Sequence, residues 1–558
     1  MPSHGSISLR VLLWISVAAV PAAAGVYIEP YLQDPRGDGM TVLWWTDESQ
    51  PDSRIEFGRD GLDRSAAASN DYVPSMGKYL HEVRLADLAP ETAYDYRVSS
   101  GPFVSGRYSL RTAVRRASGF RLGVLGDGRT DNAFVIAQHR AVLERAGGQE
   151  PDLLFELGDM VTTGDRLDWG DLYRRVVTAT DPLDPGSDLG SRVPYHTVVG
   201  NHEIYDGTYQ GGLDTGMASY RALVSHPPNG STNPHWRERY YALEYGCATF
   251  IVLDTNNTSA DAWDNNDLMP DGSTPDWQPG SEQYRWMIDR LRRAAHHSAF
   301  TFVLMHPSPY SRGAHGTPNA MTDQQRGHEL RVLDEVFRHY GVDAVLSSHD
   351  HTVEHCLTGP EGFEAAMDPG DPANLHWLVQ GNSGQGARFA VSGWESWMDI
   401  LGNDAAPFYS TYFYDWAGTA ERSFLDIEIA PRGDGQWEAA FRTMQTDGDV
   451  YDAFSLFRRD APPQVTVAGD ADVDGDVDLR DFLALRRNFG TTGTTWAMGD
   501  FDADGDVDAF DYVALKRHCG LGRGDWSAGE KPVPEPAAGL LLLLGATAGL
   551  RRRRGRRS

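Results

Sequence analysis

Cysteine is scarce in this chain. Only Cys247, Cys356 and Cys519 occur among 558 residues. At most one intramolecular pair can form, which excludes a fold built on a disulfide framework. Clusters of lysine and arginine are also missing before the last eight residues. Nucleic-acid phosphates are generally bound by such clusters, so with a formal net charge of −29 we expect no nucleic-acid-binding surface.

Long apolar runs are confined to the two ends of the chain. At the N-terminus, Arg10 precedes an apolar run over 11–20 and the small residues Ala22, Ala23 and Ala24. This pattern is typical of a secretory signal peptide cleaved near Ala24. The alternative is a retained membrane anchor, although spanning a bilayer takes about 20 apolar residues.

The length predicts several domains, because one domain usually takes about 100–200 residues. A composition of 41% hydrophobic residues with 59 glycines and 31 prolines indicates folded domains rich in turns. The expected parts, in chain order, are a signal peptide (1–24), a β-sandwich (25–115), a catalytic α/β domain (118–460), a calcium-binding repeat (469–520), a linker (521–532) and a tail with an apolar segment (533–558).

Two hydrophobic patterns separate the first two domains. Short alternating runs between Gly, Pro and Asp turns, such as 41–46 and 94–98, predict a β-sandwich. From Phe120 onward, apolar runs alternate with helical stretches, as in an α/β layered domain. The strands expected there are 120–125, 153–157, 195–199, 249–253, 300–305 and 344–347.

Nearly every one of these α/β strands is followed by a short polar motif. The motifs are Gly126-Asp127-Gly128, Gly158-Asp159, Gly200-Asn201-His202-Glu203, Met305-His306-Pro307 and His349-Asp350-His351. Ligands usually bind just past strand ends in such sheets. Carboxylates, an amide oxygen and imidazoles suit ions of intermediate hardness, and one carboxylate can bridge two ions. Together the motifs predict a two-metal site.

This set of motifs resembles the calcineurin-like metallophosphoesterase superfamily, and purple acid phosphatases in particular, over about residues 26–457. The stretch 85–94 also resembles the corner of the fibronectin-III-like domain that precedes the catalytic domain in those phosphatases, and 240–246 and 283–286 resemble spacer elements of the family. The resemblance implies a multidomain chain: a β-sandwich, an α/β metallophosphoesterase sandwich, and then a small EF-hand-like α repeat.

The resemblance also implies which residues hold the metals. That set is Asp127, Asp159, Asn201, His306, His349 and His351. Asp159 would bridge the two ions, Asp127 and His351 would complete the first site, and the remaining three the second. The ions would be two divalent or trivalent transition metals, Fe, Mn or Zn. A hydroxide bridging them would attack the phosphate ester.

Three further residues are candidates for contact with the substrate. His202, next to the ligand Asn201, is the candidate to protonate the leaving oxygen or to stabilise the charge of the transition state. His315 falls where purple acid phosphatases place a substrate-facing histidine, with an ordinary surface histidine as the alternative. Arg129 could bind substrate phosphate through its planar guanidinium.

Arg129 also marks a departure from the family. The superfamily commonly has a metal-binding histidine at that position, and a guanidinium cannot ligate a metal. Purple acid phosphatases instead place a tyrosine three residues after the bridging aspartate, where this chain has Thr162. The first site is therefore one ligand short, so its metal is either weakly held or completed by water or by a further residue. The purple colour that the tyrosinate gives is not expected.

An internal repeat follows the catalytic domain. Aspartates recur at positions 1, 3, 5, 7 and 12 of two calcium loops, with Gly475 and Gly505 at the sharp turns. The expected calcium ligands are Asp470, Asp472, Asp474, Asp476 and Asp481 in the first loop and Asp500, Asp502, Asp504, Asp506 and Asp511 in the second. This duplicated loop–helix resembles a type I dockerin, which implies a cohesin-like partner. The alternative is a module that only stabilises the chain.

The C-terminal tail combines Val533-Pro534-Glu535-Pro536, an apolar run over 537–550 and an arginine-rich end. It resembles the PEP-CTERM sorting signals of bacterial exported proteins, and the alternative is a simple anchor. In either case we expect the arginines to stay on the cytoplasmic side while the body is exported to the cell surface, the outer envelope or the medium.

The sequence thus favours an exported phosphatase or phosphodiesterase. The main alternative is a noncatalytic surface or scaffold protein with a decayed metal site, for which Arg129 is the best argument. A secreted nuclease is disfavoured by the acidic balance. Monoester and diester substrates stay equally open.

Overall fold

The computed structural model describes residues 25–178, 188–204, 215–256, 274–311, 327–359, 374–385, 408–412 and 422–459. Between 469 and 518 it describes 469, 471, 477, 479–492, 498–501 and 506–518. The expected signal peptide, linker and tail lie outside these residues, as does His315. No helix within the described ranges is long and apolar enough to cross a membrane.

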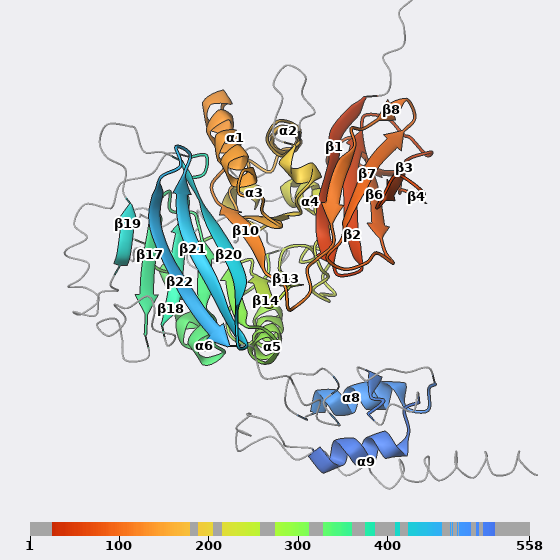
Figure 1. Cartoon of the computed structure of the whole chain (residues 1–558), viewed down its shortest axis with the longest axis vertical. Coiled ribbons are helices and arrows are strands. Elements are labelled where there is room, and N and C mark those ends of the chain that lie inside the picture. Colours follow the sequence, from red (N-terminus) through yellow and green to blue (C-terminus); the bar gives the residue numbers. More distant parts are fainter. Residues whose placement is uncertain are drawn as a thin grey trace, which may run out of the picture.

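The N-terminal domain is the expected β-sandwich (red in Figure 1). One sheet has the order β1-β2-β6-β5, and in the other β4-β3-β7-β8 is joined by β9, which pairs with β7. The strands are β1 (Val26–Arg36), β2 (Gly39–Thr46), β3 (Arg54–Gly58), β4 (Arg64–Ala67), β5 (Asp71–Val73), β6 (Lys78–Leu85), β7 (Ala93–Ser100), β8 (Phe103–Val104) and β9 (Tyr108–Arg111).

Alternation along the strands forms the core of the sandwich. In β7, Tyr94, Tyr96 and Val98 are buried while the residues between them are partly exposed, as expected where one face of a sheet is covered. The indole of Trp44 is fully buried and donates from Nε1 to Ser100 Oγ at 2.8 Å, so its one polar group is satisfied.

The described part of the α/β domain contains two sheets, of six and seven strands. The first has the order β12-β11-β10-β20-β21-β22, with β10 (Phe120–Leu125), β11 (Leu153–Glu156), β12 (Tyr195–Thr197), β20 (Ser423–Gly433), β21 (Gln436–Gln445) and β22 (Val450–Arg459). The second has the order β13-β14-β15-β16-β18-β17-β19, with β13 (Tyr241–Tyr245), β14 (Ala248–Val252), β15 (Phe300–Leu304), β16 (Ala344–Ser347), β17 (Val353–Thr358), β18 (Leu375–Gln380) and β19 (Phe408–Tyr412).

The helices of this domain connect the strands and cover the sheets. They are α1 (Ala133–Gly147), α2 (Arg166–Asp171), η1 (Leu172–Val177), η2 (Leu189–Ser191), α3 (Asn201–Ile204), α4 (Thr215–Leu223), α5 (Glu282–His297), η3 (Gly327–Leu333) and α6 (Asp334–His339). Local sequence sets their starts. The side chain of Asn132 caps α1 by accepting N–H from Phe134 and Val135, and Ser281 caps α5 through the N–H of Tyr284.

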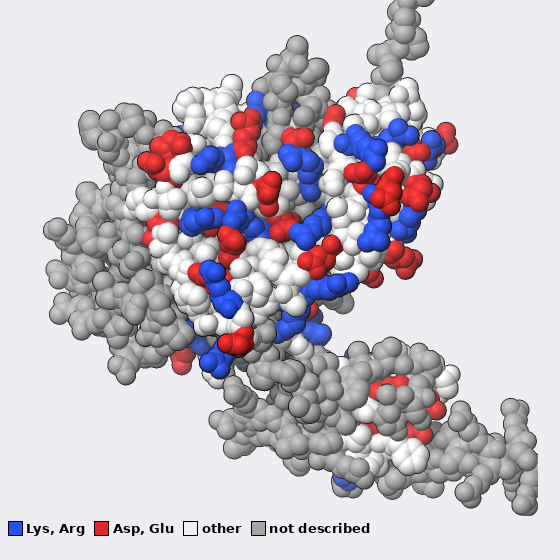
Figure 2. Space-filling model, viewed as in Figure 1, with Lys and Arg blue, Asp and Glu red and all other residues white. Residues whose placement is uncertain are grey.

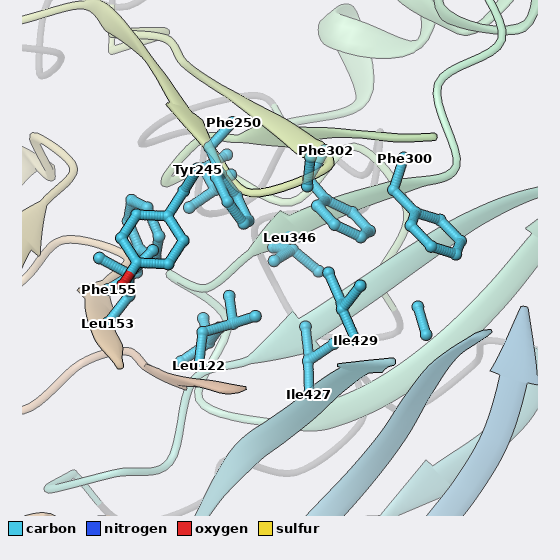
Figure 3. Close-up of a cluster of buried hydrophobic side chains, with 14 of the residues drawn as sticks. Leu122, Leu153, Phe155, Tyr245, Phe250, Phe300, Phe302, Leu346, Ile427 and Ile429 are labelled. Atoms are coloured by element: carbon cyan, nitrogen blue, oxygen red, sulfur yellow. The ribbon is translucent and has the colours of Figure 1, made fainter. Parts of the chain in front are cut away.

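The two sheets pack face to face through apolar side chains (Figure 3). Leu122 and Phe155 come from the first sheet, and Phe250, Phe302 and Leu346 from the second. All five are fully buried. All six strands expected in this domain run parallel to a neighbour within their sheet: β10, β11 and β12 in the first sheet and β14, β15 and β16 in the second. Within each sheet their carboxyl ends therefore lie on one edge.

The sandwich packs against the α/β domain through a shared apolar core. Figure 1 shows α2 and α4 beside β1. Tyr31 and Trp45 of the sandwich join a cluster that includes Trp169 and Tyr173. Polar contacts accompany it: Tyr31 Oη donates to the carbonyl oxygen of Leu223 at 2.9 Å and accepts from Trp45 Nε1 at 3.0 Å. The sandwich is thus hydrogen-bonded to the C-terminal end of α4.

Two helices form the described part of the C-terminal unit, α8 (Leu479–Asn488) and α9 (Ala509–His518). Phe482, Leu485, Val507 and Leu515 are buried between them. Of the expected calcium ligands, Asp481, Asp500, Asp506 and Asp511 are described. Those outside the described residues are Asp470, Asp472, Asp474, Asp476, Asp502 and Asp504.

Candidate metal centre

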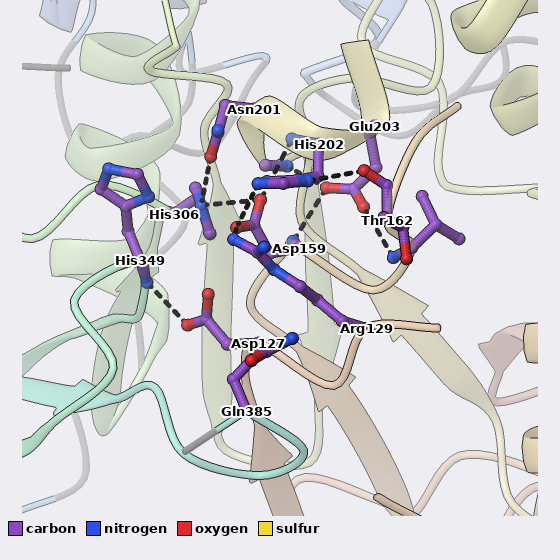
Figure 4. Close-up of polar contacts among 12 residues, drawn as sticks. Asp127, Arg129, Asp159, Thr162, Asn201, His202, Glu203, His306, His349 and Gln385 are labelled. Carbon is purple, nitrogen blue, oxygen red and sulfur yellow. Dashed lines mark hydrogen bonds and ion pairs between the residues drawn. The ribbon is translucent and has the colours of Figure 1, made fainter. Parts of the chain in front are cut away.

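The predicted site residues come from the carboxyl ends of five strands. Asp127 follows β10, Asp159 follows β11, and Asn201 opens α3 after β12. The second sheet contributes His306 after β15, and His349 and His351 after β16. Because these ends meet at one edge of the paired sheets, residues more than 200 positions apart come together (Figure 4).

Two groups of these side chains could each hold a metal ion. Asp159, His306 and His349 form one group, and Asp127, Asp159 and His351 form the other, with ligand atoms within 4.8 Å of one another. Asp159 belongs to both. In the group of Asp159, His306 and His349, His306 Nε2 lies 3.1 Å from Asp159 Oδ1 and 3.1 Å from Asn201 Oδ1.

In the group of Asp127, Asp159 and His351, His351 Nε2 lies 3.3 Å from Asp127 Oδ1. The backbone N–H of His349, which belongs to the other group, donates to Asp127 Oδ2 at 2.8 Å and so links the two groups. Asp127 and Asp159 are fully buried, and the histidines nearly so. The structure therefore brings all six predicted metal ligands into one place, without assigning their roles.

The donor set fits transition-metal ions. Carboxylate and imidazole groups suit Fe, Mn and Zn. Among the described residues, Asp127 Oδ1 accepts no hydrogen bond although it is buried, which is costly for a carboxylate oxygen unless a cation compensates. His306 Nδ1 lies 2.8 Å from the carbonyl oxygen of Leu157 and 2.9 Å from Ser348 Oγ, so Nε2 points into the site. Such anchoring of the second nitrogen is usual for metal-binding histidines.

The charges in the site are strongly coupled. Burial raises the pKa of Asp159, but His202, His306 and Arg129 outweigh that effect and hold it well below its usual range. Burial opposes a charged His306, yet Asp159 raises its pKa to about 9. A metal ion bound here would have to displace that proton, so binding is expected to release it.

The backbone at the site is strained. Asp127, Arg129, Asp159 and His349 have φ angles of +56°, +47°, +52° and +70°. Left-handed backbone is unfavourable for non-glycine residues and collects at functional sites. Cross-loop bonds hold it: the N–H of Asp127 donates to Gly158 O at 3.1 Å, and that of Arg129 to Asp159 O at 3.1 Å.

Glycines permit this close packing. A Cβ on Gly158, whose φ is +93°, would lie 2.6 Å from His306 Nδ1, and one on Gly200 would lie 2.6 Å from Asp159 Oδ1. Neither position has room for a side chain.

The candidate catalytic residue His202 lies at the edge of the metal groups. Its Nδ1 is 2.6 Å from the carbonyl oxygen of Thr162, which leaves Nε2 3.7 Å from Asp159 Oδ2. Burial lowers the pKa of His202, and Asp159 partly offsets this. Thr162 itself turns its hydroxyl to Asp131 Oδ1, at 2.7 Å.

Arg129 lies inside the centre. Its Nη2 donates to Asp159 Oδ2 at 2.8 Å, and its side chain is only 12% exposed. Phosphate binding by Arg129 stays a prediction, and His315 lies outside the described residues.

Glu203 is a residue whose importance the sequence interpretation missed. Its fully buried carboxylate accepts N–H groups from Gly200 at 2.6 Å, Asp159 at 2.9 Å and Met160 at 2.9 Å. The signal was available in the motif, where a carboxylate directly follows a candidate ligand and a candidate catalytic histidine. No sequence pattern pointed to Ser348, whose hydroxyl lies 2.9 Å from His306 Nδ1.

Comparison with family models finds three matches. Residues 130–353 match calcineurin-like phosphoesterase, residues 27–112 match the purple acid phosphatase N-terminal domain, and residues 468–519 match the dockerin type I domain. The first match begins just after Asp127 and Arg129.

Relatives and solved structures agree with these matches. Human acid phosphatase type 7 is 24% identical over 358 residues, covering 60% of this chain and 71% of the human protein. Purple acid phosphatase 15 of Arabidopsis thaliana is 24% identical, covering 56% and 55%. The yellow lupin purple acid phosphatase PPD1 superposes with a TM-score of 0.57 at 19% identity, covering 78% and 75%. PhoD gives 0.53 at 14%, covering 80% and 92%.

Proposed function

We propose that the chain hydrolyses phosphate esters at a centre of two metal ions, because residues 130–353 match calcineurin-like phosphoesterase and residues 27–112 match the purple acid phosphatase N-terminal domain. The observation that carries the proposal is the pair of ligand groups that share Asp159. Its relatives named acid phosphatases support the same chemistry.

We assign the six ligands as the sequence suggested. Asp127 and His351 would hold the first ion, Asp159 would be shared, and Asn201, His306 and His349 would hold the second. When bound, the two ions would ionise a water nucleophile near neutral pH and offset the charge of the phosphoryl oxygens. The short contacts among the donors and their burial support this division.

His202 is proposed to serve the leaving group. With Nδ1 held by the carbonyl oxygen of Thr162, Nε2 is the nitrogen that faces the site and can exchange a proton with a leaving oxygen. Arg129 is proposed to contact substrate phosphate, for which its planar donors are suited. His315 remains a proposed second contact.

The proposal is tested on purified residues 25–530. Metal content is measured by mass spectrometry, and hydrolysis of aryl phosphate mono- and diesters is assayed on the same sample after Mn, Fe or Zn is supplied. Bound transition metal with ester hydrolysis, both lost in Asp159→Asn, is the expected result. The control is Asp52→Asn, at an exposed turn of the sandwich. A chain that binds only calcium and cleaves no ester would leave the scaffold alternative.

The flanking parts point to where the enzyme works. We propose that the C-terminal unit, which matches the dockerin type I domain, binds calcium and a cohesin-like partner at a bacterial cell surface. We also propose that the terminal segments direct export. On the face shown in Figure 2, basic and acidic side chains are interspersed. Pull-down with a panel of cohesin domains, with and without calcium, tests the partner.

A further inference from the structure

The two oxygens of Asp159 have different partners. Oδ1 faces His306 Nε2 at 3.1 Å and accepts the backbone N–H of His202 at 3.1 Å. Oδ2 accepts the guanidinium of Arg129 at 2.8 Å (Figure 4). The side of the shared carboxylate away from His306 is therefore already bound to a fixed cation.

Arg129 is held in this position from two directions. Its backbone N–H donates to the carbonyl oxygen of Asp159, at 3.1 Å, so the residue is bonded to Asp159 by backbone and side chain alike. A guanidinium stays charged at all accessible pH values. Burial opposes that charge, but Asp159, Asp127 and Asp131 together raise the pKa of Arg129. The positive charge is therefore permanent and adjacent to both aspartates.

This charge affects the two metal groups unequally. In the group of Asp159, His306 and His349, His306 Nε2 lies beside Asp159 Oδ1, which Arg129 does not contact, and Asn201 Oδ1 lies 3.1 Å from the same nitrogen. The group of Asp127, Asp159 and His351 must share Asp159 with the guanidinium. Like charges in a buried site repel strongly. A divalent ion in the group of Asp127, Asp159 and His351 is therefore expected to bind more weakly than one in the His306 group, by about tenfold or more.

Arg129 also has one N–H group that is not used in these contacts. Its Nε is buried and, among the described residues, has no hydrogen-bond partner. An arginine with an unused N–H beside a single carboxylate oxygen can gain bonds by moving to a phosphate, which offers two oxygens to the planar fork. Such a move would release Asp159 Oδ2.

We propose that Arg129 couples metal loading to phosphate binding. At rest it occupies Asp159 Oδ2, and the chain holds one transition metal tightly in the His306 group. Phosphate draws the guanidinium away from Asp159 and so allows the Asp127 and His351 group to bind its ion. By linkage, an ion bound in that group raises the affinity for phosphate by the same factor. This inference rests on the proposed function.

The experiment is calorimetric titration of Mn²⁺ into metal-free residues 25–530, with calcium saturating throughout, in the presence and absence of inorganic phosphate. We expect one tight Mn²⁺ and one at least about tenfold weaker, with phosphate tightening only the weaker by about tenfold. Mass spectrometry of the metal-loaded chain supplies an independent count of ions.

Three variants separate charge from geometry. Arg129→Gln removes the charge and should give two ions of similar affinity with little effect of phosphate. Arg129→His adds a ligand and should tighten the weaker site further. Arg129→Lys keeps the charge but not the fork, so the weak site should stay weak and lose its response to phosphate. Arg115→Gln, at an exposed position, is the control.

Two results would overturn the inference while leaving the proposed function intact. One is two equally tight ions in the unaltered chain. The other is an inequality that persists in both Arg129→Gln and Arg129→His, with folding verified by circular dichroism. If no transition metal binds to any of these proteins, the proposed function itself fails.

Discussion

The Glu203 carboxylate accepts the backbone N–H of Asp159 at 2.9 Å, so a side chain from one loop of the site fixes the backbone of another. The same carboxylate accepts N–H groups from Gly200, Met160 and, at 3.4 Å, Val161. Burial and the charge of Asp159 raise the pKa of Glu203, whereas these N–H groups oppose that effect. The two carboxylate oxygens thus face four N–H donors, and none of these groups could accept a hydrogen bond from a protonated Glu203.

Replacing Glu203 by glutamine should therefore loosen the site. The amide NH₂ would face backbone N–H groups, and each buried donor left unsatisfied costs on the order of 1–3 kcal/mol. Denaturant unfolding should show that loss, and Mn²⁺ affinity should fall with it. Glu244→Gln, at the exposed position of β13, is the matched control. Unchanged stability and Mn²⁺ affinity in Glu203→Gln would show that the four bonds are dispensable.

The glycines between the ligands give a second prediction. Gly158→Ala places a methyl group 2.6 Å from His306 Nδ1 and 2.8 Å from the backbone nitrogen of Gly200, at a φ of +93°. Because the loops must shift, Mn²⁺ affinity should drop by about tenfold or more. Gly37→Ala, whose nearest atom would be 3.8 Å away, should bind Mn²⁺ normally. Equal affinities in the two variants would contradict the packing argument.

The contact between the domains predicts the effect of Tyr31→Phe. Losing the hydroxyl leaves the buried Trp45 Nε1 and the carbonyl oxygen of Leu223 without this partner. The expected cost is about 1–3 kcal/mol in the free energy of unfolding. Tyr72→Phe, at a residue 56% exposed on β5, should leave unfolding unchanged. The idea is wrong if the two variants unfold alike.

Glu238 makes stability depend on pH. Burial raises its pKa from the ordinary 4.5 to about 7. Between these values the folded chain binds more protons than the unfolded chain, so stability is fully present below about pH 4.5 and is lost as pH rises through about 7. Glu238→Gln should remove this dependence and stabilise the chain at pH 8 by about 1–3 kcal/mol. Unfolding at pH 5 and pH 8 measures it, with Glu144→Gln on α1 as the control.

Calcium removal should loosen the C-terminal unit. Asp481 Oδ1 accepts the N–H of Ala471 at 2.7 Å, and Asp511 Oδ1 that of Phe501 at 2.6 Å, so each carboxylate also holds the start of its loop. Calorimetry of the whole chain with and without a calcium chelator should show a transition that shifts downward, because metal binding contributes to folding. The double change Asp481→Asn and Asp511→Asn should shift it even with calcium present. No shift in either case would leave the loops without a bound ion.

The sequence by itself determined the order of the parts and the chemistry at each strand end. A run such as Phe120–Leu125 predicts its own strand because burial and alternation are local properties, and the residue type just after it is read directly from the chain. The β-sandwich and the types of ligand residue could therefore be predicted from the sequence alone.

Only the tertiary structure decided which partners those residues meet. The antiparallel addition of β20 to β10 joins positions about 300 residues apart, such as Phe120 and Ile429, and no local pattern specifies that pairing. The same holds for Glu203 beneath the Asp159 loop and for Arg129 on Asp159 Oδ2. These contacts depend on how two sheets align their strand ends, which is fixed by the packing of the whole core and not by any one segment.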